Sequence, residues 1–210
     1  PGKAPRNLEV YPSPRKAWLD WKVVQPYYQY GKQISYRIIV KNLRTAEIDF
    51  GHHVAVQDQS KIDYGKLLDG LKGLTNYQLN VSLINVVGEG PITSLLFATL
   101  EGVPSAYPQQ FSIVNVTFNT ISATWEAIDF EETHGILRGY HIYYRLAGLN
   151  GTWANVSVTD LAANAPVLSL RSYEIRVCGY TRVGDGIISP IHIVNTTGFS
   201  KYIIIMFFLN

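Results

Sequence analysis

Cysteine and methionine are nearly missing from this chain of 210 residues, since each occurs only once. Because Cys178 stands alone, the chain has no internal disulfide framework and no metal cluster built from several thiolates. The immunoglobulin pattern, in which two cysteines flank a core tryptophan, is excluded for the same reason. Strand parity places Cys178 on the polar side of its predicted strand, so we expect a partly exposed thiol with no assigned task.

Runs of like charge are missing as well. The 18 basic and 16 acidic residues are spread along the chain and leave a formal net charge of +2. A surface that binds nucleic acid or anionic lipid needs clustered basic residues, so we expect neither partner. No window longer than about 12 residues keeps the apolar spacing of a helix. Val, Ile, Thr and aromatic residues recur throughout, and the sequence therefore predicts an all-β protein.

Signatures of catalysis are not found either. In the segment "GEGP" at 88–91, Pro91 and then strand residues follow the second glycine. A nucleotide-binding loop needs a third glycine and a helix at this point, so the segment predicts a hairpin turn. Two histidines, His52 and His53, are adjacent, and a strand would point them to opposite faces. The other histidines stand isolated in the sequence, and they are His134, His141 and His192. The carboxylates Asp129, Glu131 and Glu132 lie in a predicted loop. We expect no catalytic, cofactor-binding or metal-binding residues, and no enzyme activity.

The chain contains two copies of one module. Pro1 and Pro5 match Pro104 and Pro108 at an offset of 103. At an offset of 104, Trp21 matches Trp125 and Tyr36 matches Tyr140. At an offset of 96, Tyr77 matches Tyr173, Gly88 matches Gly184 and Gly90 matches Gly186. The second copy has thus lost about eight residues between its third and sixth strands. We predict domains at residues 1–101 and 102–198.

Strand parity predicts which side chains are buried, because neighbours on a strand point to opposite faces. Every second residue is apolar in several runs of both copies, which are Leu19, Trp21 and Val23; Tyr36, Ile38 and Val40; Tyr77, Leu79, Val81 and Leu83; Ile121, Ala123 and Trp125; Tyr140, Ile142 and Tyr144; Tyr173, Ile175 and Val177. Turn-rich segments separate these runs at the spacing of a sandwich. Each copy therefore predicts about seven short strands.

These features resemble the fibronectin type III module over nearly all of residues 1–198. The resemblance rests on a Pro-led first strand ("APRNLEV", "YPQQFSI"), a Trp in the second ("WLDWKV", "ISATWEA") and a Tyr-led third ("ISYRIIV", "GYHIYY"). "LKGLTNY" matches the tyrosine corner, which implies that the Tyr77 hydroxyl bonds to backbone upstream. In the second copy, "LSLRSYEI" keeps Leu170 and Tyr173 but lacks about three loop residues between them, so we expect an altered corner there. The fold implied is two tandem seven-stranded immunoglobulin-like β-sandwiches.

Five Asn-x-Ser/Thr sequons are more than the one or two expected by chance, and they indicate an extracellular glycoprotein: Asn80, Asn115, Asn150, Asn155 and Asn195. Asn80 is the best placed, because it opposes the apolar face of its strand and must point to solvent. Asn150, beside Gly151 in a loop, is the second.

Exposed aromatic residues are the candidates for partner contact. Trp18 shares an outward face with Asp20 and Lys22, where it could anchor a partner or lie flat over neighbouring strands. The loop "QPYYQYGK" contributes Tyr27, Tyr28 and Tyr30. This loop falls at the end where the chain enters the first domain, so it could bind a partner or touch a preceding module.

The last segment, residues 199–210, carries eight consecutive apolar or aromatic residues from Tyr202 to Leu209. A membrane-spanning helix needs about 20. The segment is open to three interpretations: the start of a truncated transmembrane helix, a non-native tail, or an extra strand.

Two functional classes follow from the resemblance. The first is a non-catalytic module pair in the ectodomain of a single-pass cell-surface receptor or adhesion protein, similar to sidekick-type adhesion molecules. Its partner would be a cell-surface or matrix protein, or a second copy of the same protein. The second is the ectodomain of a receptor tyrosine phosphatase or kinase, whose catalytic domain lies outside this chain. Fold does not separate them.

Overall fold

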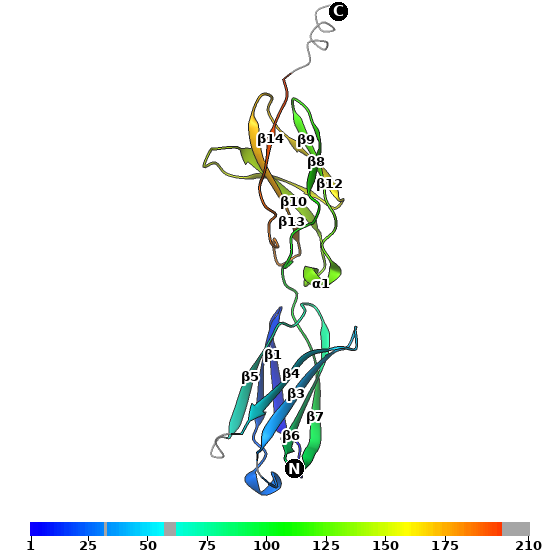
Figure 1. Cartoon of the computed structure of the whole chain (residues 1–210), viewed down its shortest axis with the longest axis vertical. Helices are drawn as coiled ribbons and strands as arrows, with labels where there is room; N and C mark the ends of the chain where they lie inside the picture. Colours follow the sequence, from blue (N-terminus) through cyan, green and yellow to red (C-terminus); the bar gives the residue numbers. More distant parts are fainter. Residues whose placement is uncertain (32, 57–61, 199–210) are drawn as a thin grey trace, which may run out of the picture. The chain divides into compact units, whose positions relative to one another are not determined.

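The computed structural model describes residues 1–31, 33–56 and 62–198. The chain divides into two compact units between Gly102 and Val103. The predicted tail at 199–210 lies outside the described residues. Both units are built from antiparallel strands, and each contains two sheets (Figure 1).

The first unit pairs a three-stranded sheet, in the order β1-β2-β5, with a four-stranded sheet, in the order β4-β3-β6-β7. Its strands are β1 (Arg6–Pro12), β2 (Lys16–Lys22), β3 (Ser35–Asn42), β4 (Ile48–Ala55), β5 (Asp63–Asp69), β6 (Asn76–Asn85) and β7 (Gly88–Ala98), and a short 3-10 helix, η1, covers Pro26–Tyr28.

The second unit repeats this arrangement, with sheets in the orders β12-β9-β8 and β11-β10-β13-β14. Its elements are β8 (Ser112–Val116), β9 (Thr120–Thr124), α1 (Phe130–Thr133), β10 (Gly139–Leu146), β11 (Ala154–Val158), β12 (Ala162–Pro166), β13 (Ser172–Tyr180) and β14 (His192–Asn195). The described residues of each unit thus contain seven strands. The predicted fold class, two tandem β-sandwiches, is confirmed.

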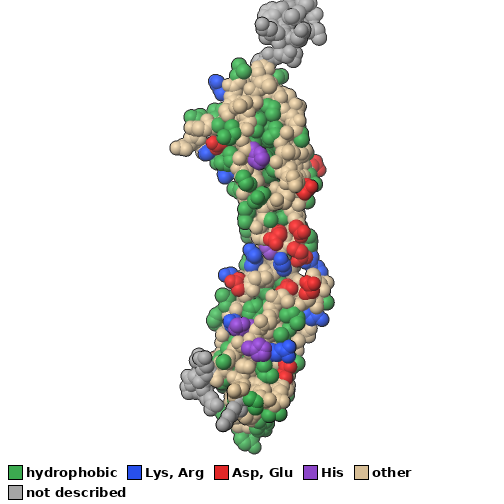
Figure 2. Space-filling view, viewed as in Figure 1, with side chains coloured by type: hydrophobic (Ala, Val, Ile, Leu, Met, Phe, Trp, Pro, Cys, Tyr) green, Lys and Arg blue, Asp and Glu red, His purple; other side chains and the backbone are tan. Residues whose placement is uncertain are grey.

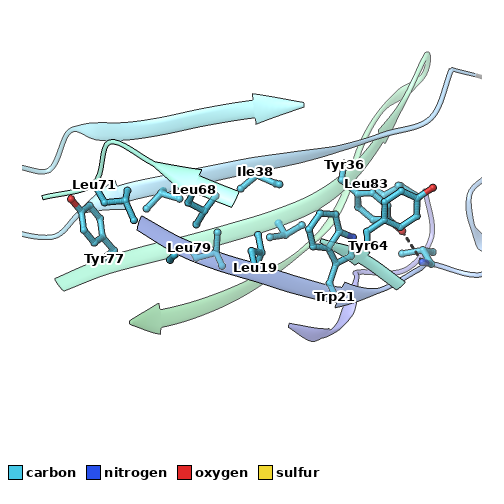
Figure 3. Close-up of a cluster of buried hydrophobic side chains, with 14 residues drawn as sticks. Leu19, Trp21, Tyr36, Ile38, Tyr64, Leu68, Leu71, Tyr77, Leu79 and Leu83 are labelled. Carbon is cyan, nitrogen blue, oxygen red and sulfur yellow. Dashed lines mark hydrogen bonds between the residues drawn. The ribbon is translucent and has the colours of Figure 1, made fainter. Parts of the chain in front are cut away.

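The core of the first unit contains the side chains that strand parity predicts to be buried. Trp21 contacts Tyr36 edge-on, with ring centroids 5.2 Å apart, and stacks against Tyr64 at 5.9 Å. Figure 3 shows these rings at one end of the core and leucines from both sheets along the rest of it. Tyr36 also accepts a hydrogen bond from the Val24 backbone N–H at 2.8 Å, so its one polar atom is satisfied inside the core.

Both units form a tyrosine corner, and the expectation for the second copy is wrong. The Lys72 N–H donates to the Tyr77 hydroxyl at 2.8 Å, as the sequence predicts, and the Leu168 N–H donates to the Tyr173 hydroxyl at 2.9 Å. The offset of 96 matches Leu71 with Val167, which is buried, and matches Leu74 with Leu170, which is exposed. Leu170 is therefore a turn residue with φ of 53°, and no loop residues are missing from the corner.

The "GEG" and "GDG" segments directly follow tight turns at residues 86–87 and 182–183, so the turn predicted at 88–91 lies two residues earlier. Their two glycines have different roles. Gly88 and Gly184 have φ of 152° and 149°, a conformation that favours glycine. A Cβ on Gly90 would lie 2.9 Å from the backbone oxygen of Pro1, and one on Gly186 would lie 2.7 Å from that of Pro104. The first glycine supplies the turn conformation, and the second allows the Pro-led strand to approach.

Candidate partner surface and modification sites

The outer face of the β1-β2-β5 sheet carries a row of exposed apolar side chains. The strand register places Tyr11 opposite Trp18 and Trp18 opposite Leu67. Trp18 is 45% exposed, and its two neighbours are exposed to a similar extent, whereas Trp21 on the same strand is 1% exposed. Parity therefore predicts both tryptophans correctly. We call Tyr11, Trp18 and Leu67 the aromatic row.

Trp18 lies flat over its own sheet. Its indole Nε1–H donates to Asp20 at 2.6 Å, and a Cβ on Gly65 would lie only 2.5 Å from the ring. The glycine on β5 leaves the space that the indole covers. One face of the ring thus contacts the sheet and the other faces solvent. Trp18 therefore lies flat over its neighbouring strands and still has an open face that could contact a partner.

Ion pairs border the aromatic row on both sides. Lys16 pairs with Asp69 at 3.2 Å, and Lys22 pairs with Asp63 at 2.6 Å. Basic and acidic side chains are also interspersed on the face of the described residues seen in Figure 2. An apolar centre bordered by charged side chains is the composition of a protein-binding surface.

The tyrosines of the loop after β2 lie at the N-terminal end of the first unit, as parity predicts. The Gly2 N–H donates to the Tyr28 carbonyl at 2.8 Å, and the Lys3 ammonium lies 3.7 Å from the Tyr28 ring centroid. The Lys3 side chain, assisted by Arg6, lowers the pKa of Tyr28. Tyr27 is 77% exposed and Tyr30 is also exposed. Tyr28 is thus tied to the first residues of the chain, and the other two remain candidates for partner contact.

The five sequon asparagines all lie on the surface. Asn115, Asn150, Asn155 and Asn195 are exposed, whereas Asn80 is half-buried and its Oδ1 accepts from the Ser94 hydroxyl at 2.8 Å. Asn80 points outward from β6, as predicted, since its neighbours Leu79 and Val81 are buried. Asn150 lies between β10 and β11, and Asn155 lies on β11.

The outer faces of the two three-stranded sheets differ in composition. In the second unit this face carries Ser122, and Ser122 lies opposite the sequon residue Asn115 on β8 and opposite Asn164 on β12. The same strands of the first unit carry the aromatic row. Among the described residues, no sequon asparagine lies on the face with the row, because Asn80 belongs to the other sheet.

Cys178 is fully buried, so the predicted partly exposed thiol is wrong. Parity does place it on the outer side of β13, since Val177 belongs to the core. Its strand partner is His141, and Tyr180 two residues further along forms a bridge with Asp185. The turn that carries Asp185 and the side chain of His141 cover the thiol.

His141 is not isolated. Its Nδ1 lies 2.8 Å from Asp185 Oδ1, and its ring stacks on Tyr180 with centroids 4.1 Å apart. The Tyr143 hydroxyl donates to the other oxygen of Asp185. Burial and the Asp185 carboxylate raise the pKa of Tyr143, so the hydroxyl stays protonated. The donor atoms of His141, Cys178 and Asp185 lie within 4.8 Å of one another.

His134 is also paired. Its Nε2 lies 2.8 Å from the Ser105 hydroxyl, and Ser105 also contacts the Glu132 carboxylate. In a hydrolase triad the carboxylate contacts the second nitrogen of the histidine. Here the carboxylate contacts the serine, and Glu132 Oε2 lies 3.9 Å from the same Nε2. This group therefore lacks the geometry of an activated nucleophile.

His192 also has a ring partner, since its ring meets Phe111 edge-on with centroids 4.9 Å apart. His52 and His53 lie exposed next to each other on β4, as predicted. Among the described residues, none of the helices has both the length and the apolar character that crossing a bilayer requires.

Comparison with known proteins identifies the second module. Residues 106–195 match the model of the fibronectin type III domain. The cell adhesion molecule DSCAM of Homo sapiens is 28% identical over 201 residues, which cover 89% of this chain and 10% of that protein. Protein sidekick-1 of Gallus gallus is 35% identical over 125 residues, or 57% of this chain and 6% of that protein.

A solved structure, that of chicken CNTN1 FN1-FN3 domains, aligns with 94% of this chain and 68% of its own at 21% identity and a TM-score of 0.46. The chain spans about a tenth of the length of the DSCAM relatives that it matches.

Proposed function

We propose that this chain, whose residues 106–195 match the fibronectin type III domain and whose first module repeats the same sheet arrangement, is a non-catalytic pair of modules in the extracellular part of a cell-surface adhesion protein or receptor. The relatives named as cell adhesion molecules support this function, and so does the excess of sequons. We further propose that the first module binds a protein partner through the aromatic row, Tyr11, Trp18 and Leu67.

The observation that carries the proposal is the contrast between equivalent faces of the two modules. Natural binding surfaces concentrate aromatic residues in an apolar centre. The β1-β2-β5 face has such a centre and no sequon among its described residues, whereas the matching face of the second module carries the sequon residue Asn115. A glycan at Asn115 would cover that face, and the aromatic row would stay open.

The rim argues for a protein rather than a polyanion. Each of the two lysines beside the row is paired with an aspartate, so the face has no unbalanced positive charge. Binding to a sulfated glycan would need such an excess. A flat aromatic face without excess positive charge is suited to another protein surface, either a second copy of this chain or a different molecule.

The test uses the glycosylated chain in multimeric form and measures its binding to two surfaces, namely beads coated with the same chain and cultured cells with and without protease treatment. We expect protease-sensitive binding to at least one of these surfaces. Trp18→Ser should reduce this binding at least about tenfold, because a tryptophan at the centre of an interface contributes about 2 kcal/mol or more.

Val114→Ser is the matched control, because Val114 is an exposed apolar residue of β8 on the second module. This variant should bind like the wild type. Wild-type protein that binds neither surface, or a Trp18→Ser variant that binds as well as the wild type, would contradict the proposal.

A further inference from the structure

Three positions that lie next to one another in both modules carry different residues in each. In the first module Ser82 and Arg37 are strand partners, and both side chains bond to Glu89 at the start of β7. The offsets of the repeat match these residues with Cys178, His141 and Asp185. The second module thus has a thiol, an imidazole and a shorter carboxylate where the first has a hydroxyl, a guanidinium and a longer carboxylate.

The residues of the first module make a structural ion pair. The Arg37 guanidinium donates to Glu89 at 2.9 Å and ties the start of β7 to β3. Arginine cannot ligate a metal ion, because its guanidinium keeps its proton. In the second module all three residues belong to the types that bind zinc, since zinc takes thiolate, imidazole nitrogen and carboxylate oxygen.

We propose that His141 Nδ1, Cys178 Sγ and Asp185 bind one zinc ion on the outer face of the β10-β13 sheet. These donor atoms lie within 4.8 Å of one another. Tetrahedral zinc with bonds of about 2.0–2.3 Å holds its ligands about 3.3–3.8 Å apart. The widest pair therefore needs to close by at most roughly 1 Å, and His141 Nδ1 and Asp185 Oδ1, now 2.8 Å apart, need to separate by about 0.5 Å. A water molecule completes the coordination.

The surrounding side chains orient the three ligands, as the residues that contact metal ligands commonly do. His141 and Cys178 lie on paired strands, and the Tyr180 ring fixes the plane of the imidazole. The Tyr143 hydroxyl donates to Asp185 and orients its carboxylate. The side chains of His141 and Asp185 are 21% and 32% exposed, so these two ligands are open to solvent, and the Cys178 thiol lies buried beneath them.

Charge balance also favours the ion. The buried Cys178 thiol lies beside the Asp185 carboxylate, so the bound site would hold two negative charges. A doubly positive ion stabilises the thiolate next to the carboxylate. On binding, the thiol proton leaves to solvent, the imidazole proton moves to Nε2, and one thiolate and one carboxylate neutralise the zinc charge.

The test measures thiolate coordination directly. The full chain, reduced and freed of metal by a chelator, is titrated with Co²⁺ and then with Zn²⁺. We expect a thiolate-to-cobalt charge-transfer absorption that saturates at one equivalent and disappears when zinc displaces the cobalt. Zinc alone should raise the unfolding temperature of the second module, because an ion that binds only the folded state stabilises it.

The first module supplies a matched variant. The triple change His141→Arg, Cys178→Ser and Asp185→Glu installs residues that already fold together at these positions. It should fold and show no cobalt band, whereas His52→Gln, which changes an exposed histidine of β4, should keep the wild-type band. No charge-transfer band in the wild-type chain would overturn the proposal, because the residues would then form only a hydrogen-bonded network. An unchanged band in the triple variant would also overturn it.

Discussion

Truncation of Trp21 tests the arrangement of the first module most severely. The ring is 1% exposed and contacts both Tyr36 and Tyr64. Replacing a buried tryptophan by alanine costs about 3–5 kcal/mol through lost transfer energy and the cavity that remains. Domains have total stabilities of about 5–15 kcal/mol, so Trp21→Ala should remove about a fifth or more of the stability of the first module.

The comparison variant is Trp18→Ala on the same strand. Half of this side chain is already exposed and its hydrogen bond to Asp20 faces solvent, so we expect a loss of about 1 kcal/mol. Trp125→Ala should destabilise the second module instead, because Trp125 lies in the core of that module.

The assay is urea denaturation followed by far-ultraviolet circular dichroism, with hydrogen exchange of peptides to assign each transition to a module. Trp21→Ala should lower the urea midpoint of the first module by more than about 1 M, given slopes of about 1–3 kcal/mol per molar urea. A Trp18→Ala variant that loses as much stability as Trp21→Ala would refute the assignment of inner and outer faces.

Three further outcomes are expected. Tyr77→Phe should cost about 2 kcal/mol in a urea melt, because it removes the hydrogen bonds to the Lys72 N–H and the Asp49 carboxylate; an unchanged midpoint would contradict this account of the corner. Peptide mapping after enzymatic deglycosylation of chain from a eukaryotic secretory pathway should show the mass shift of glycosylated asparagine at Asn80 and at one or both of Asn150 and Asn155, and unmodified asparagine at every sequon would remove the argument for an extracellular location. The Arg145 side chain lowers the pKa of Glu174, so this pair stabilises the second module at pH values above the ordinary glutamate pKa and loses that effect as the pH falls through the lowered pKa. Glu174→Gln should therefore flatten the acid side of a plot of stability against pH. An unchanged plot would show that the pair contributes nothing.

Sequence reasoning succeeded where periodicity alone decides the outcome. The alternation in "WLDWK" separates Trp21 from Trp18, and the structure buries the first and exposes the second. The repeat in turn predicts the two sandwiches, because equivalent residues of the two copies fill equivalent positions in each core.

The errors arose where tertiary contacts override parity. Cys178 lies on the outer side of its strand and is nevertheless buried, because the turn that carries Asp185 covers it. Parity reports the direction of a side chain and contains no information about what packs above it.

The offset of 96 could have corrected two other predictions. It matches Leu71 with Val167, which restores the corner of the second module. It also matches Ser82 and Glu89 with Cys178 and Asp185. Since Ser82 and Glu89 contact Arg37, which corresponds to His141, this match indicates which residues lie next to His141. The aromatic row could not be found in this way, because it depends on the register of Leu67 against Trp18, which no local pattern contains.

The central claim, that the aromatic row contacts a protein partner, is tested most directly by placing a glycan beside it. The paired change Asp20→Asn and Lys22→Thr creates a sequon on the outer face of β2, next to Trp18, whereas Asp20→Asn with Lys22→Ala makes similar changes without a sequon. Binding of the multimeric chain to its beads or cells is then measured for both variants, after mass spectrometry has confirmed the glycan. We predict that the glycosylated variant loses binding and that the control keeps it; a fully glycosylated variant that binds like the wild type would show that the partner contacts a different surface.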